Sequence, residues 1–104
     1  MQQTATTLEM VRLDVWLWAA RFFKTRGLAK TAIETGKIDV SGQRAKPARQ
    51  VHVGDVLRIV RGEETFQVEV MALSAKRGSA SVAAGLYRED EAARTLREQQ
   101  RANR

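Results

Sequence analysis

The chain has 104 residues, of which 43% are apolar, and a formal net charge of +6. This length suits one domain with a modest core and leaves little room for a cleft between two lobes. The absence of cysteine excludes a disulfide framework and thiolate metal sites, and it is typical of proteins in a reducing cytoplasm. One histidine, His52, cannot form a metal cluster or a Ser-His-Asp triad by itself. We therefore expect a cytoplasmic protein with no cofactor and no small-molecule substrate.

Membrane and export signals are missing from the sequence. No apolar run approaches the roughly 18 residues of a membrane span, so we expect no membrane partner. Residues 1–10, MQQTATTLEM, lack both the basic start and the apolar stretch of a signal peptide. They are polar and rich in threonine, which predicts a flexible N-terminus.

The next part of the chain predicts two short helices. Thr25 is a candidate N-cap for the second helix, because its hydroxyl can accept a hydrogen bond from an unpaired amide. Gly36 stands where a C-terminal cap with positive φ belongs. Between residues 11 and 23, the apolar residues at the three-and-four spacing of an amphipathic helix are Leu13, Trp16, Leu17 and Ala20. The inner face expected for the second helix consists of Leu28, Ala29, Ala32 and Ile33.

The hydrophobic period then changes to that of strands. Residues 37–40 predict a short strand, followed by a tight turn at residues 41–42 and a break at Lys46-Pro47. Gly54-Asp55 predicts another turn.

Two longer strands and one more helix are predicted after that turn. Residues 56–60 and 66–70 alternate apolar and polar side chains, with residues 61–64 as the hairpin loop between them. Residues 74–87 are rich in Ser, Ala and Gly and stay ambiguous. Residues 89–101 predict a charged, solvated helix with little apolar face.

The positive charge is concentrated in residues 12–61, which hold eleven Lys or Arg and four Asp or Glu, a net +7. The flanking segments are nearly neutral: residues 1–11 carry −1, residues 62–87 carry −1 and residues 88–104 carry +1. Because four acids cannot pair eleven cations, an ordinary solvated face is the less favoured alternative. A basic surface held on a folded scaffold favours a polyanion, and nucleic acid is the first choice.

The turn between the two helices is the expected centre of this site. It would present Arg21, Lys24 and Arg26 together at the start of the second helix, where free N–H groups and the helix dipole also attract phosphate. The 46–49 loop would add cations from the strand side. Arginines grip phosphates bidentately, so binding should follow the backbone shape more than the base sequence. The cations singled out are Arg12, Arg21, Lys24, Arg26, Lys30, Arg44, Lys46 and Arg49.

Two other residues, Asp14 and Trp18, allow two interpretations each. Asp14 either orients a neighbouring arginine or favours the helix N-terminus electrostatically, and a structural role is the favoured one. Trp16 and Trp18 lie about 200° apart on a helix, so both cannot point into the core. Trp16 is assigned to packing. Trp18 either packs or offers a surface to a base or partner, and packing is favoured.

The order of these features resembles the S4 RNA-binding domain over about residues 11–60. The resemblance implies an α+β fold of the αL type, with two N-terminal helices packed on a small antiparallel sheet and a C-terminal helix. We expect an S4-type domain with a strand extension in residues 11–73, and a linker and charged helix in residues 74–104. The resemblance adds Thr25 to the RNA-contacting candidates. It rests on Arg12-Leu13-Asp14, Leu17, Arg21, Thr25-Arg26, Ala29, Ile33, Gly36, Ile38, Val40, Gly42 and Val53-Gly54-Asp55.

A narrower resemblance is to the family of bacterial ribosome-associated heat-shock proteins of about fifteen kilodaltons. It implies a non-catalytic protein that recognises ribosomal RNA on large subunits stalled with a nascent chain on transfer RNA, and that aids their recycling in stress. Ribosomal RNA, possibly with transfer RNA, is then the partner, and the free protein is expected to be a monomer. The strings that carry this resemblance are residues 11–14, 16–22, 24–26, 42–44, 46–47 and 86–87.

Two alternatives come from other classes of protein. S4 domains accompany RNA-modifying synthases, but the three aspartates Asp14, Asp39 and Asp55 occupy structural-looking positions, so we expect no enzyme. A protein-interaction or chaperone role would use Trp18 and the C-terminal helix as its contact surface.

Overall fold

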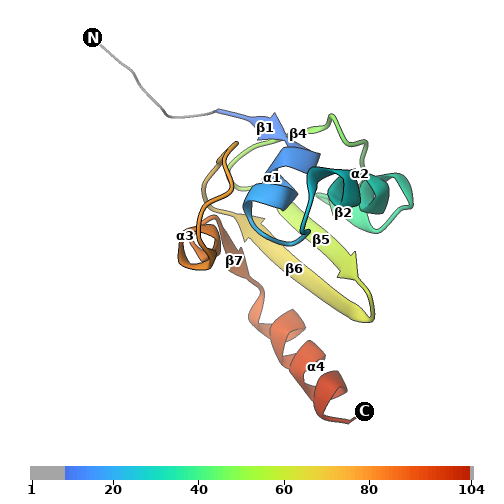
Figure 1. Ribbon diagram of the computed structural model, residues 1–104. Helices are drawn as coiled ribbons and strands as arrows, with labels where there is room; N and C mark the ends of the chain where they lie inside the picture. The colour runs from blue at the N-terminus through green and yellow to red at the C-terminus, as the bar shows by residue number, and fades with distance from the viewer. Residues whose placement is uncertain (1–8, 104) are drawn as a thin grey trace.

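The computed structural model describes residues 9–103, and the predicted flexible N-terminus falls almost entirely outside them. Figure 1 shows two short helices against one face of an antiparallel sheet, with a last helix extending away from it. In chain order the elements are β1 (Val11–Arg12), α1 (Leu13–Ala19), α2 (Arg26–Glu34), β2 (Ile38–Val40), β3 (Gln43–Arg44), β4 (Gln50–Val51), β5 (Val56–Arg61), β6 (Glu64–Val70), α3 (Ala80–Ala84), β7 (Tyr87–Glu89) and α4 (Glu91–Ala102).

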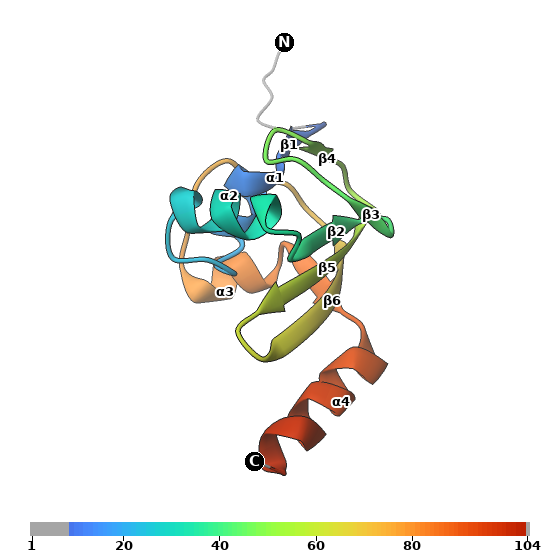
Figure 2. The ribbon, with the colours of Figure 1, turned by 90° about the vertical axis from the view of Figure 1, so that its right-hand side faces the viewer.

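The main sheet has the strand order β3-β2-β5-β6-β7, and every neighbouring pair is antiparallel. A separate short ladder joins β1 to β4. The predicted α+β fold of the αL type, with two N-terminal helices on an antiparallel sheet, is confirmed (Figure 2). The β2–β3 turn has Ser41 at φ 52° and Gly42 at φ 80°. Two positive φ values in a two-residue loop match the right-handed twist of the flanking strands.

The core lies between α1, α2 and the inner face of the sheet. Leu13, Trp16 and Leu17 of α1 are completely buried. The Trp16 ring stacks on Phe22 at 6.2 Å, and its Nε1 donates a hydrogen bond to the Ala72 carbonyl at 3.0 Å. The packing role predicted for Trp16 is therefore confirmed, whereas Trp18 lies half-buried at the edge of the core.

The first helix is shorter than predicted. It ends at Ala19, because the chain turns through Arg21 at φ 65°. The Arg21 amide donates to the Trp18 carbonyl at 3.1 Å and the Phe22 amide to the Leu17 carbonyl at 3.0 Å. These two bonds form a Schellman motif, in which the left-handed position is usually glycine. The turn sends Phe22 back into the core, where it is 4% exposed.

One further sequence-based prediction needs correction, and the structure resolves one stretch that the sequence left ambiguous. Leu28 was expected on the inner face of α2, but it is 53% exposed, while Ala29, Ala32 and Ile33 are buried as predicted. The ambiguous stretch before residue 88 contains α3 and the start of β7, which pairs with β6 as an edge strand. This pairing is non-local, so local periodicity gave no signal for it.

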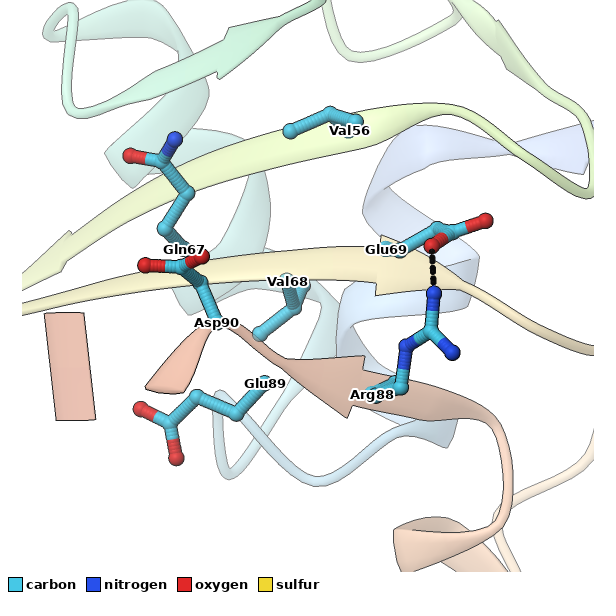
Figure 3. A pocket seen from close by; sticks show the side chains of 7 residues that line it. All are labelled: Val56, Gln67, Val68, Glu69, Arg88, Glu89 and Asp90. Atoms are coloured by element: carbon cyan, nitrogen blue, oxygen red, sulfur yellow. Dashed lines mark hydrogen bonds and ion pairs between the residues drawn. The ribbon is translucent and has the colours of Figure 1, made fainter. Parts of the chain in front are cut away.

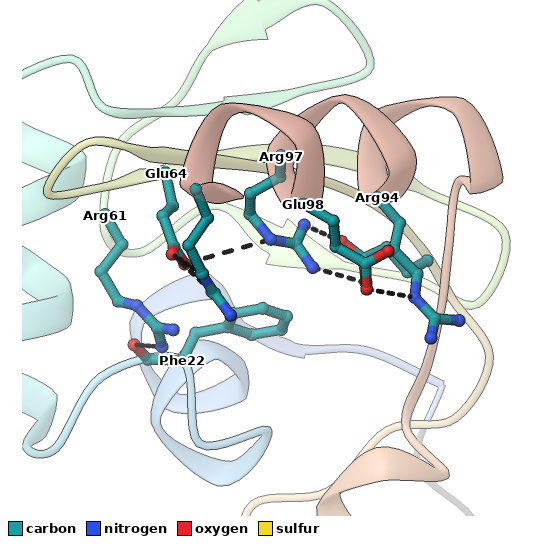
Figure 4. A network of polar contacts seen from close by, with 8 residues as sticks. Phe22, Arg61, Glu64, Arg94, Arg97 and Glu98 are labelled. Carbon is teal, nitrogen blue, oxygen red and sulfur yellow. Dashed lines mark hydrogen bonds and ion pairs between the residues drawn. The ribbon is translucent and has the colours of Figure 1, made fainter. Parts of the chain in front are cut away.

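The C-terminal helix docks on the sheet through two arginines, Arg97 and Arg101. Arg97 lies with its guanidinium 4.1 Å from the centroid of the Phe66 ring and forms an ion pair with Glu89. Figure 4 shows Arg97 on α4 and its contact with Glu64. The Arg97 Nε lies 4.0 Å from Glu64, which also accepts a hydrogen bond from Arg101 Nε at 3.1 Å. The expected solvation of this helix therefore does not hold for the face of α4 that carries Arg97, whose side chain is 10% exposed.

Acid is expected to weaken this docking. The hydrogen bond from Arg101 lowers the pKa of Glu64 in the folded protein. The ionised Glu64 therefore contributes to folding stability above its ordinary pKa, and this contribution is lost as pH falls through the lower folded pKa. Between about pH 5 and about pH 3, the urea midpoint should fall more steeply for the native chain than for Glu64→Gln. Glu91→Gln, a change at an exposed position of α4, should keep the native pH profile of the urea midpoint. Parallel profiles for all three proteins would rule out this role for Glu64.

Candidate nucleic-acid interface

The start of α2 carries exposed cations with no counter-charge. Thr25 has extended φ and its Oγ1 accepts a hydrogen bond from the Leu28 amide at 3.0 Å, which confirms the predicted N-cap. Lys24 and Arg26 flank this cap, Lys30 follows in the middle of α2, and all three are exposed. None of these three side chains has an ion-pair partner within residues 9–103. Their charges are therefore free to attract an anion.

A second group of cations lies in the loop between β3 and β4, which runs from the sheet back toward α1 (Figure 2). The carbonyls of Pro47 and Arg49 accept hydrogen bonds from the first amides of α1, at 3.3 Å from Asp14 and 2.8 Å from Leu13. These bonds satisfy donors that a helix start otherwise leaves unpaired, and they hold the loop in place. Lys46 is exposed and Arg49 half-buried on this fixed loop.

Arg44 is held at the C-terminal end of α2. Its Nη2 donates to the Glu34 carbonyl at 2.8 Å, which caps the helix. Gly36 has φ 79°, as predicted, and a Cβ there would lie 3.5 Å from the Arg44 Cζ. Glycine at this position thus serves both the helix end and the close approach of the guanidinium. We call the surface formed by Lys24, Arg26, Lys30, Arg44 and Lys46 the basic face.

Arg12 lies outside the basic face and is tied to Asp14. Its Nε and Nη2 donate to the two Asp14 carboxylate oxygens at 3.1 and 3.0 Å, and this bonding raises the pKa of Arg12. Asp14 is only 4% exposed and also accepts from the Val15 amide at 2.8 Å. The structural role favoured for Asp14 is what the structure shows, and half of the Arg12 side chain remains accessible.

Two arginines lock the turn between α1 and α2 to the 74–79 segment. Arg21 Nη1 donates to the Gly78 carbonyl at 2.7 Å. Arg77 Nη1 donates in return to the carbonyls of Trp18 at 2.6 Å and Phe23 at 3.0 Å. Sequence reasoning missed Arg77, because it lies with Lys76 in a stretch of small residues that carries no periodic signal and falls outside the basic segment 12–61. The structure thus places Arg21 partly in a structural contact.

Arg21 allows its side chain to be tested separately from its backbone. Glycine adopts φ 65° without strain, so Arg21→Gly should be more stable than Arg21→Ala by about 1 kcal/mol in urea unfolding. Both variants lose the guanidinium, and both should bind RNA several-fold more weakly, as measured by fluorescence anisotropy. Recovery of native RNA affinity in Arg21→Gly alone would show that Arg21 acts only through the fold.

The C-terminal cations differ from the basic face because carboxylates neutralise them. Arg88 pairs with Glu69 at 2.6 Å and Arg94 with Glu98 at 3.3 Å. The hollow beside β6 and β7, about 290 Å³, contains the Arg88–Glu69 pair (Figure 3). Its lining is acidic on balance and does not suit a phosphate: Val56, Gln67, Val68, Glu69, Arg88, Glu89 and Asp90.

Metal-binding clusters and membrane-spanning helices are both absent from residues 9–103. In the described part of the chain, no group of three or more His, Cys, Asp or Glu side chains could hold a metal ion. No helix between residues 9 and 103 is both long and apolar enough to cross a bilayer.

A capped helix pair on an antiparallel sheet, with unpaired cations along the second helix, defines an S4 domain, and residues 11–57 match the S4 domain family model. The chain belongs to the heat shock protein 15 family. It is 48% identical over 92 residues to the heat shock protein 15 homolog of Aeromonas salmonicida, covering 88% of this chain and 70% of that protein. Both resemblances seen in the sequence are confirmed.

Two further relatives extend the comparison. A solved structure, described as the trimeric structure of Vibrio cholerae heat shock protein 15, matches with a TM-score of 0.88 and 43% identity, covering 92% of this chain and 97% of that one. A protein of Bacillus subtilis named RQC P-site tRNA stabilizing factor is 36% identical over 63 residues, covering 61% of this chain and 73% of that protein.

Proposed function

We propose that this protein binds structured RNA through the basic face and catalyses no reaction. The observation that carries the proposal is the contrast in pairing: Lys24, Arg26, Lys30 and Lys46 have no carboxylate partner among the described residues, whereas four arginines of β7 and α4 are paired. Unpaired, exposed cations release counterions from phosphates when they bind, which supplies most of the affinity for nucleic acid. Arg12, Arg21, Thr25, Arg44 and Arg49 complete the proposed contact set.

The proposed RNA is ribosomal RNA of large subunits stalled with a nascent chain on transfer RNA, which the protein would help to recycle in stress. Membership of the heat shock protein 15 family supports a ribosomal partner. The name of the Bacillus subtilis relative refers to P-site transfer RNA, and it supports transfer RNA as a second contact. This role belongs in the cytoplasm.

Sedimentation of a lysate from heat-stressed cells tests this function. The protein should travel with large subunits that retain peptidyl transfer RNA, and added salt should release it because phosphate contacts are salt-sensitive. A protein that stays at the top of the gradient under stress would contradict the ribosomal part of the proposal.

Analytical ultracentrifugation of the free protein tests the expected monomer, since the solved Vibrio cholerae relative is described as trimeric.

A protein-interaction role is the second candidate, because Leu28 of α2 is 53% exposed and Trp18 is half-buried. RNase treatment distinguishes RNA binding from a direct protein contact. RNA binding predicts that the association with subunits is lost after RNase, and a direct protein contact predicts that it survives.

A further inference from the structure

A groove at the end of α2 has features that phosphate contacts alone do not require. It is open, has a volume of about 480 Å³ and lies between the last turn of α2 and residues 44–47. Its apolar lining comes from Pro47, Ala45 and Ile33; Pro47 is half-buried and Ala45 is 9% exposed, so these two offer surface to a ligand, whereas Ile33 is completely buried. A phosphate gains nothing from apolar contacts, whereas the flat ring of a base does. The lining therefore fits a nucleobase better than a phosphate.

Both walls of the groove are fixed before any ligand binds. Arg44 is held against the Gly36 backbone by its bond to the Glu34 carbonyl, and it remains exposed. Pro47 is held by the bond from the Asp14 amide to its carbonyl. A planar guanidinium fixed in this way can stack on a base, and little side-chain entropy is lost on binding.

Glu34 is the one acid that lines this groove. Its carboxylate forms no ion pair among residues 9–103, although Lys30 lies one helical turn before it. A carboxylate repels phosphate and can only accept hydrogen bonds. Guanine offers two adjacent donors, N1–H and the N2 amino group, which one carboxylate can accept together. Unpaired bases in RNA are commonly recognised along this edge.

The exposed side of α2 leads toward the groove. Arg26, Lys30 and Glu34 follow each other at intervals of four residues, so they lie along one side of the helix over about 12 Å. An RNA backbone bound by the two cations would bring a following nucleotide to the groove, where Lys46 is available for its phosphate.

The geometry points to a site for a single unpaired guanine. Its ring stacks on the Arg44 guanidinium, its N1–H and N2 amino group donate to the Glu34 carboxylate, and its phosphate meets Lys46. This inference rests on the proposed binding of RNA and adds a base preference to it.

RNA hairpins that differ only in one bulged nucleotide test the site, with affinity measured by fluorescence anisotropy for the native chain, Glu34→Gln and Glu91→Gln. The native chain and Glu91→Gln should prefer bulged guanine over bulged uracil by about 10-fold. Glu34→Gln should bind the guanine hairpin more weakly than the native chain does, while it binds an unbulged hairpin equally or more tightly because a negative charge is gone. Arg44→Lys, which keeps the charge but not the plane, should weaken binding to every bulged hairpin relative to the unbulged one.

Glu34→Gln should weaken binding of the guanine hairpin but not of the unbulged hairpin. Loss of a negative charge alone would strengthen binding to both, so the two explanations predict different results. If Glu34→Gln bound all hairpins more tightly by the same factor, or if the native chain showed no base preference, the guanine site would be overturned while RNA binding stood. Failure of the native chain to bind any hairpin would overturn the proposed function as well.

Discussion

Arg26→Glu is expected to weaken the binding of structured RNA by about 10- to 100-fold, because a hydrogen bond to a charged group contributes roughly 1.5–3 kcal/mol. Arg26 is exposed in the first turn of α2 and has no acidic partner in the described chain, so reversal of its charge acts on the RNA and not on an internal ion pair. Fluorescence anisotropy at several salt concentrations measures the effect. The slope of log affinity against log salt should become shallower by about 1 when one phosphate contact is lost.

Arg94→Glu is the matched control for this experiment. Arg94 is exposed on α4, and within residues 9–103 its one ion pair is with Glu98 at 3.3 Å, a surface pair of little energetic weight. The same change of charge there should alter RNA affinity by no more than about two-fold. Equal losses in the two variants would mean that the protein attracts RNA through its net charge and has no localised site.

Arg77→Ala is expected to lower RNA affinity by about 10-fold without touching the RNA, because its guanidinium bonds to two carbonyls of the α1–α2 turn. Loss of these bonds should also cost about 1–3 kcal/mol of folding free energy. The salt dependence distinguishes this positioning role from a direct contact. Since no phosphate contact is removed, the slope of log affinity against log salt should stay native while the affinity falls.

Lys76→Ala controls for Arg77 at the neighbouring position. The Lys76 side chain is exposed and the described residues offer it no ion pair, so its removal should leave the urea midpoint unchanged. A shallower salt slope in Arg77→Ala would show that Arg77 itself contacts RNA. Native stability in that variant would show that its two hydrogen bonds do not hold the turn.

The local features of the fold could be predicted because each depends on a few neighbouring residues. The Thr25 cap needs only a hydroxyl one residue before a helix, and Gly36 needs only the end of an apolar period. The alternation of β5 and β6 follows from their half-buried faces.

The features that escaped prediction depend on contacts between distant parts of the chain. Arg21 in a left-handed conformation has no sequence signal, since glycine is the residue expected there. The docking of Arg97 on Phe66 joins residues on α4 and β6, and β7 has too few residues to show a period. In each case tertiary contacts decide the conformation.

In the candidate site, too, the sequence indicates local features but not those that depend on tertiary contacts. Counting charges singles out a set of cations as the candidate site, but it gives every cation equal weight. The structure distinguishes Lys24, Arg26 and Lys30, which have no partner in the described chain, from Arg12 and Arg44, which are already bonded. Pairing depends on which acids fold nearby, and the sequence does not contain that information in a local form.

Photocrosslinking from single positions tests most directly whether the basic face binds RNA of the large subunit. A photoreactive group at Lys30 should crosslink to ribosomal RNA or transfer RNA of gradient-purified stalled large subunits, and sequencing of the attached RNA identifies the contact. The same group at Gln99, on an exposed position of α4, serves as the matched control and should give few RNA crosslinks. RNA crosslinks of equal yield from both positions, or crosslinks from Lys30 to protein alone, would contradict the assignment of the basic face as the RNA-binding surface.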